Sequence, residues 1–325
     1  MKYLFLILFT VSLNAQILPS QQATHYKKNS GPASGTKSFN NCVKTGSYGP
    51  SQSDCNSSYS GTSLNGEVTV TDGIQYWTVP TTATYTITAI GATASNQNDT
   101  DTPVGHPAKI IGDFSLTSGT VLKILVGQTG WMASSRPGWG AGGGTFVTKN
   151  DNTILVIAGG CGSSHKNITG TYSYQDGNTA EPGRDNIDTS VPYNRPGTNG
   201  GGGFEDTAAG WNGGGGGGGG YSGNGDKGNN QTYTLASGVP TSHTIPQSFL
   251  NGGVGDVIGG GFGGGAGVTN TWGGGGGGYS GGAGSSQHPY TGTGGGSKNN
   301  GSNQTNTLHD NNNIIMSHGS VTITW

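Results

Sequence analysis

The chain has 325 residues, of which 67 are Gly and 13 are Pro, while only 9% are charged and the formal net charge is −2. Glycine and proline together make up about a quarter of the chain, at the edge of the range typical of low-complexity sequences. Disordered chains usually carry more charge than this one. The sequence has no basic cluster, which excludes nucleic acid as the expected partner.

The N-terminus has the pattern of a secretory signal peptide, predicted to span residues 1–15. Lys2 precedes an apolar stretch at 3–13 that is too short to cross a bilayer, and the small residue Ala15 offers a cleavage point. No later run reaches about 20 apolar residues. We therefore expect a secreted, extracellular product with no membrane span after signal removal.

Residues 16–65 are polar and lack apolar periodicity, so we interpret them as a loose, low-complexity N-terminal segment. Cys42 and Cys55 lie in this segment, and in an oxidising compartment they are the candidate disulfide. Cys161 is then left over, either as a buried thiol or as the partner of one of the other two.

Strand patterns begin at residue 66 and continue to residue 158. Apolar residues alternate at Val68 and Val70 and again at Tyr85 and Ile87, without helical periodicity. Glycine then dominates from about 159 to 302, and one more strand follows within 314–325. The simplest arrangement is a mostly β domain at 66–325, an antiparallel β-sandwich closed by its last strand, with the glycine-rich part as an insert.

The glycine runs at 213–220 and 273–278 are each framed by aromatic residues. Such runs can be flexible linkers, or they can form polyglycine-II helices that pack side by side. Only glycine permits so close an approach, since a Cβ would collide with the neighbour. We favour packing, with the flanking aromatics as structural anchors; the candidates are Trp211, Tyr221, Phe262, Trp272 and Tyr279.

Four stretches occur in a fixed order: "YWTVPTTATYTITAIGA" (76–92), "GAGGGTFVTKNDNTILVIAGGCG" (140–162), "GGGFGGGAGVTNTWGGGGGGYSGGAGSSQ" (259–287) and "IIMSHGSVTITW" (314–325). Together they resemble the glycine-rich extracellular region of the anaplastic lymphoma kinase and leukocyte tyrosine kinase receptors. The resemblance implies a tumour-necrosis-factor-like β-sandwich with an inserted bundle of polyglycine helices. In those receptors the region binds small cytokines and promotes dimerisation. Kinase motifs are absent, so kinase activity is not implied.

Catalytic motifs lack the context that their chemistry requires. The G-x-S-x-G match at 278–282 follows six glycines rather than a strand, and the seven His residues show no zinc-ligand spacing. We expect no catalytic residues, no metal and no cofactor, and therefore no enzyme. Six sequons are candidate N-glycosylation sites: Asn56, Asn98, Asn167, Asn230, Asn300 and Asn303.

The function that we favour is a secreted, non-catalytic recognition module that binds an unknown extracellular protein or glycan. The low charge and the glycine content also fit an extracellular structural or surface-coat protein, for which self-association is expected. Ice binding is a weaker third hypothesis, because the glycines are clumped rather than placed at every third residue.

Overall fold

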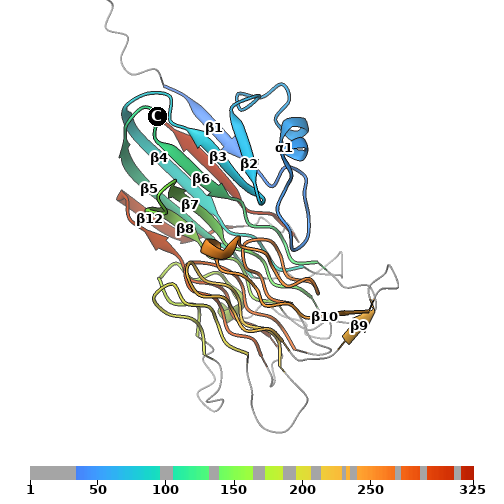
Figure 1. Ribbon diagram of the computed structural model, residues 1–325. Helices are drawn as coiled ribbons and strands as arrows, with labels where there is room; N and C mark the ends of the chain where they lie inside the picture. Colours follow the sequence, from blue (N-terminus) through green and yellow to red (C-terminus); the bar gives the residue numbers. More distant parts are fainter. Residues whose placement is uncertain are drawn as a thin grey trace, which may run out of the picture. The chain divides into compact units, whose positions relative to one another are not determined.

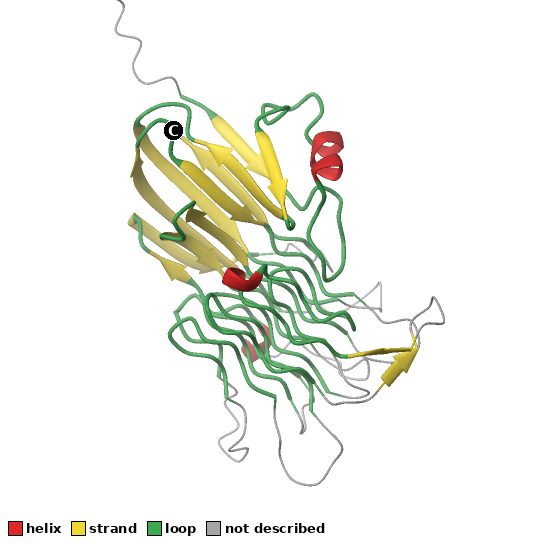
Figure 2. Cartoon of the chain, in the orientation of Figure 1, coloured by secondary structure: helices red, strands yellow, loops and turns green. Residues whose placement is uncertain are grey.

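The computed structural model describes residues 34–95, 105–131, 139–163, 173–185, 195–205, 214–228, 232–234, 240–267, 272–285, 291–310 and 316–325. All of them belong to one compact unit, Pro32–Trp325. The described chain is mostly β, with little helix (Figures 1 and 2). Its elements are β1 (Thr36–Phe39), α1 (Gln52–Ser58), β2 (Val68–Thr71), β3 (Ile74–Thr78), β4 (Ala83–Ile90), β5 (Ala108–Leu116), β6 (Val121–Leu125), β7 (Thr145–Lys149), β8 (Ile154–Ala158), the 3-10 helix η1 (Ser173–Gln175), β9 (Thr232–Thr234), β10 (Pro240–Ser242), the 3-10 helix η2 (Phe249–Asn251), β11 (Lys298–Asn299), β12 (Ser302–Leu308) and β13 (Ser320–Thr324).

Two antiparallel sheets share a hydrophobic core, which is consistent with the predicted β-sandwich. Among the described strands, one sheet has the order β1-β13-β4-β5-β12 and the other β11-β8-β7-β6-β3-β2, while β9 and β10 pair separately. Tyr85 and Ile87 of the first sheet lie in the same buried cluster as Trp77, Ile124 and Val147 of the second. Burying such side chains contributes roughly 1.5–3 kcal/mol each.

The interpretation of residues 16–65 as a loose segment is wrong for residues 34–65. β1 pairs with the C-terminal strand β13, with Thr36 opposite Thr324, and Phe39 is buried in a T-shaped ring contact with Trp77. A four-residue strand and a seven-residue helix are too short to show periodicity, and the strand that pairs with β1 lies at the other end of the chain.

The predicted end of the glycine-rich insert, near residue 302, is also too late, and the predicted strand set at 314–325 omits two strands. β11 pairs with β8, and β12 extends the first sheet by pairing with β5, Thr307 lying opposite Lys109. All seven side chains of β12 are exposed, so this strand carries no alternation of buried and exposed residues from which it could be recognised.

Between β8 and β11 the described backbone runs mainly as irregular segments that lie side by side (Figure 2). We call residues 159–297 the glycine region. Gly203 donates its N–H to Gly218 O and Gly218 donates to Gly282 O, both over 2.8 Å. The N–H and C=O of Gly218 thus bond to two different segments, whereas paired residues of an antiparallel sheet exchange both bonds with one neighbour. The segments are therefore joined on more than one side.

These backbones lie too close together for side chains. A Cβ on Gly281 would lie 1.8 Å from Gly218 O, and one on Gly140, in the β6–β7 connection, would lie 1.5 Å from Gly259 O of the glycine region. Glycine is required at such positions because every other residue carries the Cβ that would collide.

A second core attaches the glycine region to the sandwich. Leu125 and Phe146 of the second sheet are buried together with Phe249 and Phe262 of the glycine region. The rings of Phe146 and Phe249 stack with centroids 5.0 Å apart, and Tyr221 stacks on the Phe249 ring at 5.7 Å. The second sheet is therefore covered by apolar groups on both of its faces.

Candidate binding site

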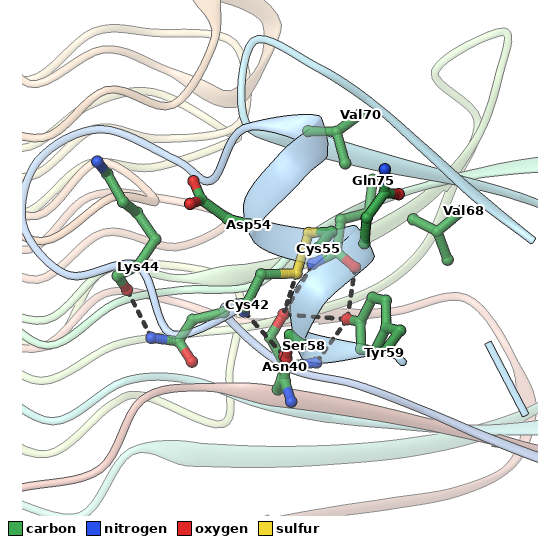
Figure 3. Close-up of a disulfide and its surroundings, with 12 residues drawn as sticks. Asn40, Cys42, Lys44, Asp54, Cys55, Ser58, Tyr59, Val68, Val70 and Gln75 are labelled. Atoms are coloured by element: carbon green, nitrogen blue, oxygen red, sulfur yellow. Dashed lines mark hydrogen bonds between the residues drawn. A yellow bond between two sulfur atoms is a disulfide. The ribbon is translucent and has the colours of Figure 1, made fainter. Parts of the chain in front are cut away.

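The predicted disulfide joins Cys42 to Cys55 and ties the loop after β1 to α1 (Figure 3). We call residues 40–50 the Tyr48 loop. Cys42 and Val43 adopt left-handed backbone angles, with φ of 51° and 60°, and the Asn40 side chain accepts the Cys42 N–H over 2.8 Å. The disulfide and this side-chain bond hold an unfavourable local conformation in place.

Buried polar side chains fix the start of the loop. The Tyr59 hydroxyl accepts the N–H of Asn40, and the Gln75 amide donates to Asn40 O over 2.8 Å. Tyr59 in turn donates to the Gln75 side chain over 2.7 Å. Burial raises the pKa of Tyr59 to about 12, so the phenol stays protonated and keeps its donor at neutral pH.

The glycine region and the β6–β7 connection fix the second half of the loop. Phe262 donates its N–H to Gly46 O over 2.8 Å and Gly255 donates to Ser47 O over 2.9 Å, while the Gln128 amide donates to Tyr48 O over 3.3 Å. The backbone around Tyr48 is therefore bonded to parts of the chain far away in sequence. Tyr48 is nevertheless 58% exposed.

A cavity of about 750 Å³ opens beside this tyrosine. Its walls come from the Tyr48 loop, the first turn of α1, the β2–β3 hairpin and the segment around η2. A second cavity of about 550 Å³ shares Lys44 and Tyr48 and is also lined by Trp131 and Val257. The polar side chains that line the larger cavity are Lys44, Tyr48, Ser51, Gln52, Asp54, Asp72, Gln247 and Asn251.

Some of these polar side chains hold the wall in place through hydrogen bonds, and others bring a charged group to the cavity. The side-chain amide of Gln52 makes two hydrogen bonds to the backbone of β2. It donates to Val68 O over 3.0 Å and accepts the Val70 N–H over 2.7 Å. Asp54 accepts the backbone N–H of Ser51.

Three groups lower the pKa of Asp54: the Ser51 backbone bond first, then the Ser51 hydroxyl, then the charge of Lys44. The side chains of Lys44 and Asp54 extend to the same side of the disulfide (Figure 3). Asp72 is exposed in the β2–β3 turn. The cavity is therefore lined by one lysine and two aspartate side chains.

The predicted aromatic anchors lie elsewhere. Tyr221, Phe262 and Tyr279 belong to the second core, Trp272 is half-buried, and Trp211 lies outside the described residues. None of those that are described lines either cavity.

The sequence reasoning missed Tyr48 and Lys44 as site residues. The sequence does contain a pattern that indicates an exposed Tyr48. This tyrosine lies among Gly46, Gly49 and Pro50 within the predicted disulfide loop, and such turn-forming residues place a side chain at the surface.

The sequons that the structure describes are all at exposed asparagines: Asn56 on α1, Asn300 after β11, and Asn303 in β12. Asn98, Asn167 and Asn230 lie outside the described residues. Exposure permits attachment of a glycan, but glycosylation at these six positions stays a prediction.

Other reactive groups are placed in structural settings. Cys161 is a buried thiol outside any disulfide, and burial raises its pKa, which makes it a poor nucleophile. The Ser280 hydroxyl of the G-x-S-x-G match is buried and accepts the Gly200 N–H. His318 accepts the Thr129 N–H over 3.1 Å. Across the described ranges, no three metal-ligating side chains gather, and no helix has the length and apolarity to span a bilayer.

Comparison with known proteins gives a partial similarity to a receptor. No family model matches the chain. The leukocyte tyrosine kinase receptor of mouse is 35% identical over 95 residues, which is 28% of this chain and 11% of the receptor. The chain thus spans about a tenth of the length of the relative that it matches.

Proposed function

We propose that this chain is an extracellular recognition module without catalytic activity, similar to part of the ectodomain of receptor tyrosine kinases. The partial similarity to the leukocyte tyrosine kinase receptor supports this relationship. The Cys42–Cys55 disulfide supports an oxidising, extracellular location. The observation that carries the proposal is the Tyr48 loop, because its backbone is fixed by long-range hydrogen bonds while its aromatic side chain stays exposed.

We also propose that the sandwich is tumour-necrosis-factor-like and that the glycine region is a bundle of polyglycine-II helices. The bundle is supported by glycine backbones that bond sideways to several segments at distances that exclude a Cβ. Ordering a residue costs about 1–2 kcal/mol and a backbone hydrogen bond returns about 1 kcal/mol. The aromatic rings of the second core supply the further stabilisation that such a bundle needs.

The proposal is limited to binding. The similarity covers 11% of the receptor, and the kinase motifs are not in this sequence, so kinase activity is not part of it. The buried, poorly acidic thiol of Cys161 and the buried Ser280 hydroxyl are unsuited to nucleophilic catalysis.

Saturable binding to extracellular material tests the proposal. Fluorescently labelled chain is titrated onto the cell-surface and secreted fraction of the source organism, with excess unlabelled chain as competitor. We expect saturable, competed binding that Tyr48→Ala weakens and Phe204→Ala leaves unchanged; Phe204 is an exposed aromatic that lies outside both cavities. Non-saturable binding with concentration-dependent light scattering would instead support a structural coat protein, and thermal hysteresis would support ice binding.

A further inference from the structure

We infer that the larger cavity beside Tyr48 binds a neutral oligosaccharide. The inference rests on the proposed recognition function and gives its site a ligand class. An exposed tyrosine that lines a cavity presents a flat apolar ring together with a polar hydroxyl. A pyranose ring has the matching chemistry, because its C–H groups form an apolar face and its hydroxyls project around the edge.

The fixed backbone preorganises the Tyr48 ring for binding. The carbonyls of Gly46, Ser47 and Tyr48 each accept a hydrogen bond from a distant residue. At Gly49 a Cβ would lie 2.5 Å from the Cα of Gly73, so the loop is pressed against the β2–β3 hairpin. A ligand that stacks on Tyr48 therefore loses little free energy to ordering of the loop.

The polar groups around the ring match hydroxyls better than ions. Lys44 is a donor, Asp54 and Asp72 are acceptors, and the Gln247 amide provides both. One cation against two carboxylates disfavours sulfated or uronic-acid sugars, which need a cationic site. A neutral sugar hydroxyl can donate to a carboxylate and accept from an ammonium group within the same cavity.

The size of the site favours a chain of sugars. The larger cavity, at about 750 Å³, lies within the range of small-molecule sites, which is roughly 300–1,000 Å³. The second cavity shares Lys44 and Tyr48 and adds the rings of Trp131 and the side chain of Val257. An oligosaccharide that crosses Tyr48 would occupy both cavities.

An extended peptide fits the same wall less well. Peptides commonly bind by adding a strand to an exposed sheet edge. The adjacent edge strand here is β2, and the Gln52 amide already occupies Val68 O and Val70 N. The backbone groups that a peptide strand would use are therefore taken.

Calorimetric titration of the full secreted chain with cellohexaose, laminarihexaose, mannohexaose and chitohexaose tests the inference. We expect at least one of these probes to bind, Tyr48→Ala to weaken it about tenfold or more, and Tyr48→Phe to retain most of the affinity. Phe204→Ala should bind as the parent chain does. Circular dichroism and the thermal midpoint verify that each variant is folded.

Failure of all four probes to bind, or binding that Tyr48→Ala leaves unchanged, would overturn the inference. Periodate oxidation of the sugars in the extracellular material distinguishes failure of the saccharide assignment from failure of the recognition function. Saturable binding that survives periodate and depends on Tyr48 would overturn the saccharide assignment and leave the recognition function intact, with a protein as the partner. Loss of binding after periodate would support both.

Discussion

Replacing Gly281 with alanine tests the steric basis of the glycine region. The new Cβ would lie 1.8 Å from Gly218 O, whereas ordinary contacts begin near 3.4 Å, so one backbone must move by about 1.6 Å. Overpacking of this kind costs about 1–3 kcal/mol. The shift also disturbs the bonds from Gly281 N–H to Gly201 O and from Gly197 N–H to Gly281 O, each worth about 1 kcal/mol.

We therefore expect Gly281→Ala to lose about 3–5 kcal/mol of unfolding free energy, which lowers the thermal midpoint by about 6 °C or more. Gly61→Ala is the control, because Gly61 has a φ of +74° and no atom beyond its two chain neighbours lies within 4 Å of the place that its new methyl group would take. It should lose only about 1 kcal/mol, from backbone strain. Calorimetry and denaturant titration measure both variants. Equal losses of unfolding free energy in the two variants would show that close backbone packing does not stabilise the region.

Three further outcomes are expected. Replacing both Cys42 and Cys55 with serine should cost about 3 kcal/mol in a urea titration, because the disulfide closes a short loop across a sequence separation of 13; an unchanged midpoint would show that the loop is held without it. Burial lowers the pKa of His318 below 6.5, so the unfolded chain takes up a proton first and stability should fall as pH drops below about 6.5. His318→Gln should reduce that fall, and an identical pH profile of thermal midpoints would contradict the assignment. Native Cys161 should resist a thiol-specific reagent and react only on unfolding; rapid labelling of the folded chain would show that it is accessible.

The strands with a clear alternation were predictable from sequence. In β4 the apolar residues Tyr85, Ile87 and Ala89 are buried while their neighbours are partly exposed, so a period of two was visible in the sequence. The same holds for β13, in which Val321 and Ile323 are buried. Local pattern and final burial agree in these elements because each strand has one face toward the core.

β1 and β12 could not be found in this way. β1 spans four residues and pairs with β13 at the far end of the chain, while β12 has no buried face. Each of them forms because it pairs with a strand of the sheet. Its own residues therefore do not show the pattern from which a strand is predicted.

The candidate site was out of reach for a related reason. The chain around Tyr48 is held by Gly255 and Phe262, about 200 residues further along, and the cavity also takes walls from α1 and η2. A sequence shows that a tyrosine between glycines is exposed, but not which distant backbone holds it still. The disulfide was predictable because Cys42 and Cys55 are close in sequence.

Hydrogen–deuterium exchange of the glycine amides at 214–220 and 273–278 measures whether closely packed glycine backbones form a rigid scaffold. We expect protection comparable to that of the amides in β4 and β5, because Gly218, Gly275 and Gly276 donate to carbonyls of neighbouring segments. Exchange of these amides at the rate of an unstructured peptide would contradict it, since the Tyr48 loop would then lack the support on which its proposed role depends.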